Sequence, residues 1–217
     1  MFEYFEISYL DALEKLGEEL LSVYINDFEC RYIKGDAEND VNAEINDVEK
    51  FIKEKIQIYD KNGISRSYLI FAKANSKHTH KLVLVGYYSI AFKPFEFSSD
   101  VSRKSKKRIA GHHTFMKGPL PAILIGQLGK NESDTAFKGS LIHGREIMKM
   151  ALTRIKSIHD DIAFSLIYLE CKDCEKLKTF YSKLGFTLHA NERGTPYKND
   201  KNDLVRFIAP VTLLNDI

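Results

Sequence analysis

The segment YLECKDCEKLKTFYSKLGF, residues 168–186, decides the fold. It continues the apolar run AFSLIYLE at 163–170, whose unbroken hydrophobicity is typical of a central strand buried on both faces. From Asp173 onward, apolar residues repeat at helical spacing until Gly185 stops them, which predicts a short helix. A helix that directly follows a buried strand indicates a sheet covered by helices.

Around this segment the pattern continues in both directions. FTLHA at 186–190 and DLVRFIAP at 203–210 flank a polar turn and predict a closing β-hairpin. Upstream, PAILIGQLG at 121–129 predicts another strand. A long helix is expected after it, with one apolar stripe made of Gly144, Ile147, Met148, Ala151, Leu152 and Ile155.

The first half of the chain begins with two predicted helices. Ser8 followed by Asp11 indicates a capped helix start, and leucines then recur at helical spacing with a weak point at Gly17. Asn46 and Glu49 have the spacing of a capping box, and the second helix is expected to start there. Helically spaced apolar residues continue until a glycine at position 63 stops the run.

Two strands follow these helices. SRSYLIFA at 65–72 and KLVLVGYYSIAF at 81–92 are rich in branched and aromatic residues and predict a hairpin, whereas the polar stretch at 35–44 predicts a loop. The order of elements predicts the fold class α/β (α+β), a mixed central sheet with helices on both faces.

Length and composition limit the class of protein. The 217 residues are 44% hydrophobic and 29% charged, with a formal net charge of +2, so disorder and fibrous structure are excluded. The apolar runs are far shorter than the roughly 20 residues that span a bilayer, and the first residues lack the basic start of an export signal. We therefore expect a cytoplasmic protein with no membrane attachment.

The cysteines and histidines give weaker signals. Cys30, Cys171 and Cys174 form no disulfide framework, and the CxxC of the last two lacks the further ligands that a zinc site needs. His112 and His113 are neighbours in a polar segment, which is more typical of solvent-exposed residues than of a metal site. No metal is expected.

Three segments resemble the GNAT superfamily of acyl-coenzyme A dependent N-acetyltransferases: LIGQLG at 124–129, GSLIHGREIMKMAL at 139–152, and residues 168–186. The resemblance implies acetyl-CoA as cosubstrate and a primary amine that attacks its thioester directly. It also implies a mostly antiparallel sheet in a single domain over 1–217, with an N-terminal helical half at 1–64 and a cofactor-binding core at 120–190.

The resemblance also implies where the cofactor binds. In the superfamily, backbone N–H groups of a turn at a helix start hold the pyrophosphate, because orphan donors and the helix dipole converge there. The matching turn departs from the superfamily pattern at Gly139 and Ile142, and a branched residue does not easily adopt a positive φ. The implied cofactor-binding residues are Gln127, Leu128, Gly129, Lys138, Gly139, Ser140, Leu141, Ile142, His143, Gly144, Arg145 and Cys174.

Catalytic roles follow from the same resemblance. Tyr181 matches the tyrosine that protonates the departing thiolate, and a phenol with a pKa of ~10 is protonated at neutral pH. Phe180 is assigned to the core. A backbone N–H of Leu128 or Gly129 is expected to bind the oxyanion, and Cys174 stands where many relatives have Asn. No residue is identified as the base.

A second resemblance rests on five segments: FEC at 28–30, DVEKFIKEK at 47–55, SRSYLIF at 65–71, VGYYSIA at 85–91 and LPAILIGQL at 120–128. Their layout is similar to that of the GNAT toxins of toxin–antitoxin pairs, which acetylate the amino acid on charged tRNA. In that group a basic segment lies between the third and fourth strands, and SRKSKKR at 102–108 occupies the matching place. Lysine and arginine neutralise phosphates and supply sequence-independent affinity for RNA. The implied tRNA contacts are Arg103, Lys104, Lys106, Lys107 and Arg108.

Several alternatives stay open at the level of sequence. The basic segment is equally typical of a solvated surface, in which case the acceptor is an amine on a small molecule or protein. The departures at Gly139, Ile142 and Cys174 also fit a non-catalytic binding module that kept the fold. The apolar terminal strands either complete the sheet or mediate a homodimer.

Overall fold

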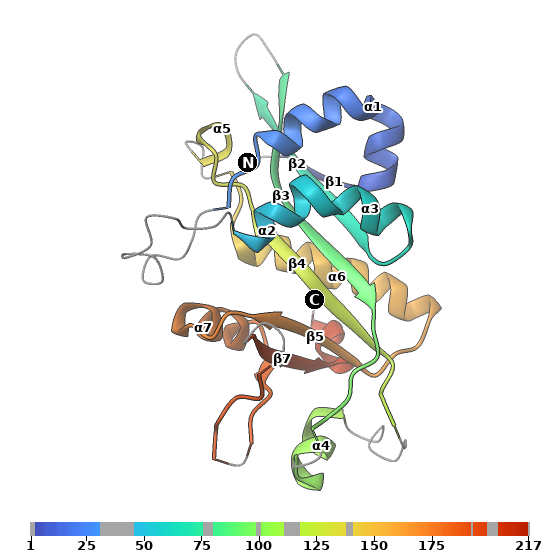
Figure 1. Ribbon diagram of the computed structural model, residues 1–217, viewed down its shortest axis with the longest axis vertical. Coiled ribbons are helices and arrows are strands. Elements are labelled where there is room, and N and C mark those ends of the chain that lie inside the picture. The colour runs from blue at the N-terminus through green and yellow to red at the C-terminus, as the bar shows by residue number, and fades with distance from the viewer. Residues whose placement is uncertain are drawn as a thin grey trace. The chain divides into compact units, whose positions relative to one another are not determined.

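The computed structural model describes residues 3–30, 46–75, 80–98, 101–110, 118–137, 141–191, 193–198 and 204–216. One seven-stranded sheet has the order β1-β2-β3-β4-β5-β7-β6. Figure 1 shows its strands with the helices that flank them. The elements are β1 (Tyr4–Ser8), α1 (Tyr9–Asn26), α2 (Asp47–Lys50), the π-helix η1 (Phe51–Lys55), α3 (Ile56–Lys61), β2 (Arg66–Asn75), β3 (His80–Phe92), α4 (Arg103–Ala110), β4 (Ala122–Lys130), α5 (Asp134–Phe137), α6 (Gly144–Asp161), β5 (Leu166–Cys171), α7 (Glu175–Lys183), β6 (Thr187–Leu188), β7 (Val205–Pro210) and the 3-10 helix η3 (Val211–Asp216).

The chain divides into two compact units that interleave along the sequence. The first unit consists of Met1–Ile90 with Gln127–Met148, and the second of Ala91–Gly126 with Lys149–Ile217. The β4–β5 pair is parallel, whereas β1–β2, β2–β3, β5–β7 and β6–β7 are antiparallel, so the predicted mixed, mostly antiparallel sheet is confirmed. No helix in the described part of the chain is long and apolar enough to cross a bilayer.

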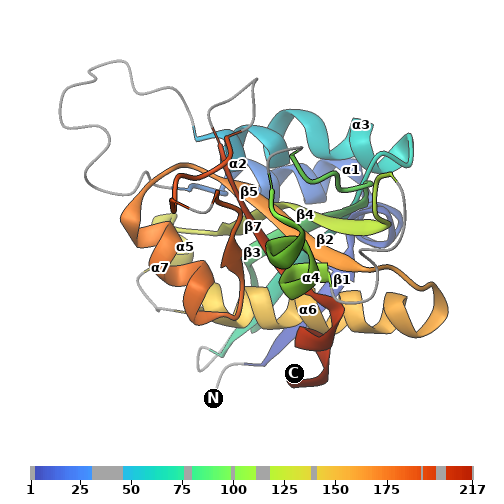
Figure 2. The ribbon, with the colours of Figure 1, turned by 90° about the horizontal axis from the view of Figure 1, so that it is seen from below.

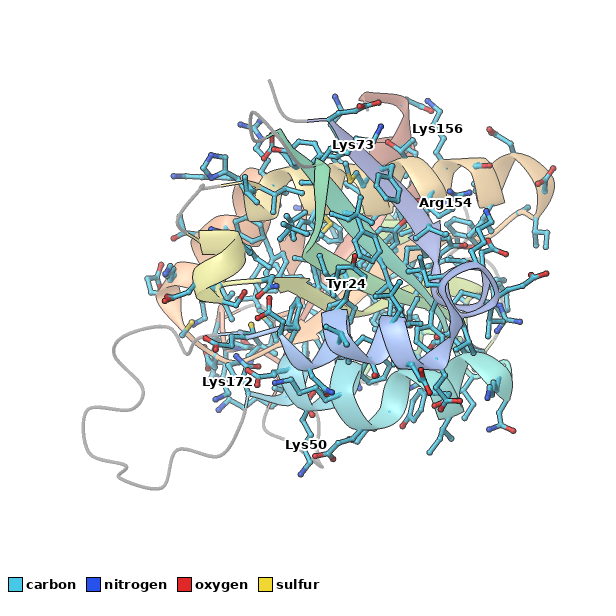
Figure 3. The ribbon with its side chains drawn as sticks, turned by 90° about the horizontal axis from the view of Figure 1, so that it is seen from above. Tyr24, Lys50, Lys73, Arg154, Lys156 and Lys172 are labelled. Carbon is cyan, nitrogen blue, oxygen red and sulfur yellow. The ribbon has the colours of Figure 1, made fainter. Side chains whose placement is uncertain are left out.

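Helix α1 begins as predicted. The Ser8 side chain accepts a hydrogen bond from the Asp11 amide at 3.1 Å, which caps the helix. Gly17, with φ 77° and ψ 161°, kinks the helix at the predicted weak point. Tyr24 packs edge-on against Phe71 of β2 with ring centroids 5.2 Å apart (Figure 3), and this contact orients the second half of α1 against the strands.

The strand β1 was not predicted. It precedes α1 directly and pairs with β2 from Tyr4↔Ala72 to Ser8↔Tyr68. Phe5 and Ile7 alternate along it and pack against the core of the first unit. A half-apolar run of this length becomes a strand only because β2 supplies its hydrogen-bond partners.

The second helical run is predicted correctly in extent but not in detail. The Asn46 side chain caps it by accepting from the Val48 amide at 3.0 Å. Glu49 does not complete the capping box, because its carboxylate accepts from the Cys30 amide and pairs with Lys53. The middle of the run is the π-helix η1, which the sequence pattern does not reveal.

Helices cover both faces of the strands in the first unit. On one face, α1 and α3 cover β2 and β3 (Figure 2). Leu69, Phe71 and Tyr87 are buried in the core on this side together with residues of α1, η1 and α3. On the opposite face, Gly86 allows close approach of α6, since a Cβ added there would lie 2.6 Å from Ile147 Cδ1.

The second unit has the same layered order. Ile109 and Ala110 of α4 pack on Leu166, Tyr168 and Ile208. On the other face of β5 and β7, the rings of Tyr181 and Phe207 pack together with centroids 5.6 Å apart, which places α7 there. The predicted closing hairpin is confirmed by the β6–β7 pairing.

Candidate functional site

The end of β4 is a strand edge that pairs with no strand on its β5 side among the described residues. Pairing with β5 covers only Ala122↔Leu166 to Ile125↔Leu169, whereas β4 itself continues to Lys130 (Figure 1). Backbone donors beyond the last pair are therefore not used by this ladder. Such donors at a strand end are suited to binding an oxyanion.

The backbone direction distinguishes the two predicted oxyanion donors. The Asn131 amide donates to the Val85 carbonyl of β3 at 2.9 Å, and a Cβ added at Gly86 would lie 2.9 Å from the Gly129 carbonyl oxygen. Gly129 and Asn131 thus direct their backbone groups towards β3. Because the backbone N–H and C=O groups of successive strand residues point alternately to the two edges, the N–H of Leu128 points away from β3.

Gly129 instead has a packing role that the sequence did not reveal. A Cβ there would lie 2.6 Å from Val48 Cγ1, 2.8 Å from Tyr87 Cε1 and 3.0 Å from Phe28 Cζ. Only glycine allows α2 and these two rings to approach the strand so closely. Two residues before Gly129, the Gln127 side chain donates from Nε2 to Asp47 Oδ2 at 3.2 Å and joins the strand to the start of α2.

The start of α6 differs from a glycine-rich phosphate turn. Lys138, Gly139 and Ser140 lie outside the described residues. Leu141 and Ile142 have exposed fractions of 5% and 1%, and the Leu141 carbonyl accepts a hydrogen bond from the Tyr4 hydroxyl. The Ile142 side chain is buried in the core, so this residue could bind a ligand only through its backbone amide.

An acidic side chain already occupies part of this helix start. The His143 amide donates to Glu146 Oε2 at 2.7 Å, so the carboxylate satisfies one of the orphan donors of the first turn. Gly144 is half-buried, and His143 and Arg145 are exposed. Glu146 is thus an internal anion at the position where the resemblance implies a pyrophosphate, and the capping-box spacing His143–Glu146 could have revealed it.

Tyr181 lies in the second unit on α7. This helix has Cys174 as its N-cap and starts at Glu175, two residues after the predicted start at Asp173, and it ends before Gly185 with φ 88°. Burial, together with the nearby Cys171 and Cys174, raises the pKa of Tyr181. The phenol therefore remains protonated well above neutral pH, as a general acid for a thiolate leaving group must.

The same environment disfavours the thiolate form of Cys171. Burial, followed by the nearby Cys174 and Asp173, raises the pKa of Cys171 to about 12. All three cysteines are free, and Cys174 makes no side-chain cap to α7. Within the described ranges, no group of three or more His, Cys, Asp or Glu side chains could hold a metal ion.

The basic segment forms most of α4, between β3 and β4. Arg103, Lys104 and Lys107 are exposed, whereas Lys106 is half-buried with its ammonium 5.9 Å from the centre of the Phe97 ring. The side chain of Arg108, as well as His112 and His113, lies outside the described residues. Three cations of the segment are therefore available to solvent.

A cavity of about 200 Å³ lies elsewhere in the first unit, between α1 and the run η1–α3. Its lining includes Tyr9, Leu21, Ile52 and Ile58, and none of the predicted site residues contributes to it. Helices α1 and α3 lie side by side in Figures 1 and 2. The cavity is therefore a gap between packed helices, and the strand end at Leu128 is the better candidate for chemistry.

No protein-family model and no curated protein sequence matches the chain. Among solved structures, a tyrosine-to-phenylalanine mutant of KacT is similar with a TM-score of 0.61 and 17% identity, covering 99% of this chain and 98% of KacT. AtaT complexed with acetyl-methionyl-tRNAfMet has a TM-score of 0.60 and 16% identity, with 98% of each chain covered. AtaTR bound with acetyl-CoA has a TM-score of 0.57 and 15% identity, with 98% and 96% covered. KacT and AtaT are GNAT toxins, and this likeness shows that the chain has the GNAT fold.

Proposed function

We propose that this protein is an acetyl-CoA dependent N-acetyltransferase that transfers the acetyl group directly to a primary amine. The observation that carries the proposal is the end of β4, where pairing with β5 stops at Ile125 and Leu128 directs its N–H to the open edge. AtaTR, which is similar over nearly its whole length, has been solved bound with acetyl-CoA. The GNAT fold and an open strand edge together favour acyl transfer over a binding role.

Two groups of this chain have roles in the proposed reaction. Attack of the amine on the thioester carbonyl forms a tetrahedral oxyanion, and the Leu128 N–H is preorganised to stabilise it. When the C–S bond breaks, the Tyr181 hydroxyl donates its proton to the sulfur. The raised pKa of Tyr181 keeps that proton available throughout the neutral range. KacT and AtaT have both been solved as tyrosine-to-phenylalanine mutants, which agrees with a role for a tyrosine hydroxyl.

The start of α6 is the proposed pyrophosphate site. The first-turn amides of Gly144 and Arg145 and the exposed Arg145 guanidinium would hold the phosphates. Glu146 opposes this binding with its own charge. We therefore expect the start of α6 to bind acetyl-CoA with moderate rather than tight affinity.

The first experiment is a calorimetric titration of the purified protein with acetyl-CoA. We expect a dissociation constant in the micromolar range for the wild type and loss of binding in Gly144→Trp, whose indole would fill the helix start. Binding that survives in Gly144→Trp would exclude the α6 site. No binding to the wild type would contradict the enzyme proposal and favour a non-catalytic module.

A second candidate names the acceptor as the α-amino group of an aminoacyl-tRNA. AtaT complexed with acetyl-methionyl-tRNAfMet is similar over 98% of both chains, and α4 presents Arg103, Lys104 and Lys107 to solvent. The α-amino group of an aminoacyl ester has a low pKa, so it is already neutral enough to attack without a dedicated base. This fits a chain in which no base was identified.

The tRNA candidate is tested by removing charge from α4. In Arg103→Gln/Lys104→Gln/Lys107→Gln, we expect charged tRNA to bind at least tenfold more weakly, with a reduced dependence on salt. A matched control neutralises three exposed lysines elsewhere, Lys15, Lys61 and Lys149. Equal tRNA binding by both triple variants would reject α4 as the contact and favour a small-molecule or protein amine.

A further inference from the structure

Asn131 is the first residue after β4, and it is a buried polar residue with an exposed fraction of 1%. Its side-chain Nδ2 donates to the Leu84 carbonyl of β3 at 2.7 Å. Its Oδ1 accepts from the Glu29 amide at 3.1 Å and from the Ser133 amide at 2.9 Å. With the backbone bond to Val85, one residue joins the end of β4 to β3 and to the segment that follows α1.

The segment 27–30 is tied to the end of β4 by further bonds. The Glu132 amide donates to the Glu29 carbonyl at 2.7 Å, and Ser133 Oγ donates to Asp27 Oδ2 at 3.3 Å. The Cys30 amide in turn donates to Glu49 Oε2 at 2.9 Å. Buried amide networks that are fully satisfied are rigid, and losing one partner leaves the others unpaired in a low dielectric.

This network lies at the end of β4, beyond the last described pair with β5. Beyond Ile125, β4 does not pair with β5 in the described part of the chain, so its course depends on β3 and on the contacts that fix its end. Leu128 lies only three residues before Asn131 in sequence. A displacement of about 1 Å in such a donor lowers turnover by roughly 100-fold, because the oxyanion hole must be formed before the reaction.

We infer that Asn131 is a positioning residue that fixes the oxyanion-binding edge of β4, an inference that rests on the proposed acetyltransferase function. Asn131 does not touch the reacting atoms. Its amide holds the strand end against β3 through Leu84 and against the segment after α1 through Glu29. The α6 start has no hydrogen bond to Asn131 in the described part of the chain, so cofactor affinity should not depend on it.

Asn131→Asp tests the inference, because it keeps an acceptor for the Glu29 and Ser133 amides and replaces only the donor to Leu84 with an acceptor. We expect kcat for acetyl transfer to fall by about 10- to 100-fold, while the acetyl-CoA dissociation constant stays within about threefold. The matched control is Asn62→Asp, since Asn62 also donates from its side chain to a carbonyl, that of Ile58 at 2.8 Å, but at the exposed end of α3.

The neutral variant Asn131→Ser keeps the test independent of a buried charge and of a folding failure in Asn131→Asp. A lowered kcat with unchanged cofactor affinity in the folded variant supports the inference. If the wild type is active and the Asn131 variants have the same kcat, this inference alone is overturned. A loss of kcat that only parallels the fraction of unfolded variant would overturn it as well. A wild type that neither binds acetyl-CoA nor transfers acetyl would overturn the proposed function and this inference with it.

Discussion

Helices α6 and α7 begin in opposite ways, although the superfamily resemblance assigns a cofactor role to both. The first turn of α6 buries Ile142 beside it and has the Glu146 carboxylate bonded to the His143 amide. The first turn of α7 begins at Cys174, whose side chain makes no cap, and carries Tyr181 further along in a buried aromatic setting. The start of α6 is thus packed and capped by the chain's own side chains, whereas the start of α7 has no side-chain cap.

This difference shows which parts of such a site tolerate change. A proton donor requires one hydroxyl at one place, so its surroundings must persist around it. Phosphate binding uses backbone amides, which any residue supplies as long as the helix starts at the same place. If the start of α6 binds phosphate as proposed, its side chains remain free to pack in the core, as those of Leu141 and Ile142 do.

The largest expected effect separates core residues from turn residues. We expect Ile142→Ala to lower the free energy of unfolding by about 3 kcal/mol, because it removes a fully buried side chain and leaves a cavity. Chemical denaturation of the wild type and Ile142→Ala measures this difference. The contrasting change at the start of α7, Cys174→Asn, should raise the free energy of unfolding by a few tenths to about 1 kcal/mol, since Asn is a favoured N-cap. An unchanged free energy of unfolding in Ile142→Ala would contradict the assignment of Ile142 to the core.

The next effect concerns the tyrosine helix. Tyr181→Phe should lower kcat by about 100-fold through loss of the proton donor, while acetyl-CoA binds almost unchanged. Steady-state kinetics and calorimetry separate the two. Tyr24→Phe, which also removes one hydroxyl from a tyrosine packed on a phenylalanine, is the matched control and should retain wild-type turnover. Equal rates for all three proteins would remove Tyr181 from the mechanism.

A smaller effect tests which helix start binds the phosphates. Glu146→Gln removes a negative charge from the first turn of α6, so acetyl-CoA should bind about two- to fivefold more tightly. Glu175 occupies the first turn of α7, and Glu175→Gln should leave the affinity within error. If Glu175→Gln tightens binding and Glu146→Gln does not, the comparison is reversed and α7 is the phosphate site.

The last prediction is that kcat does not decline at alkaline pH. Because the pKa of Tyr181 is raised above its ordinary value of about 10, the protonated acid is present throughout the range in which the amine substrate loses its proton. The wild-type kcat should therefore rise with pH to a plateau and stay there up to about pH 10. A decline with an apparent pKa below 9 would indicate another acid.

The sequence predicted the order of elements well because hydrophobic periodicity and glycine stops are local signals. Gly17, Gly63 and Gly185 each have positive φ at the places where helices were expected to weaken or end. Strand β1 and the π-helix η1 were missed, since the first depends on pairing with β2 and the second on packing around Phe51 and Ile52.

The site was predictable only where one side chain carries the role. The role proposed for Tyr181 comes from its motif and stays a prediction, and the structure adds the burial that raises the pKa of Tyr181. The preference for Leu128 over Gly129 required the backbone direction, which no sequence pattern encodes. Asn131 was missed because its partners, Leu84 and Glu29, are distant in sequence and contribute backbone groups alone.

The kink at Gly17 has a consequence for how this chain folds during synthesis. It divides α1 into two pieces, and each is shorter than the roughly 12–15 residues that an isolated helix needs in water. Strand β1 likewise has no partner until β2 has been made. Strand β1 and helix α1 therefore cannot hold their structure before β2 has been synthesised. We expect them to wait, largely unordered, until the β2–β3 hairpin emerges and provides the surface on which they settle.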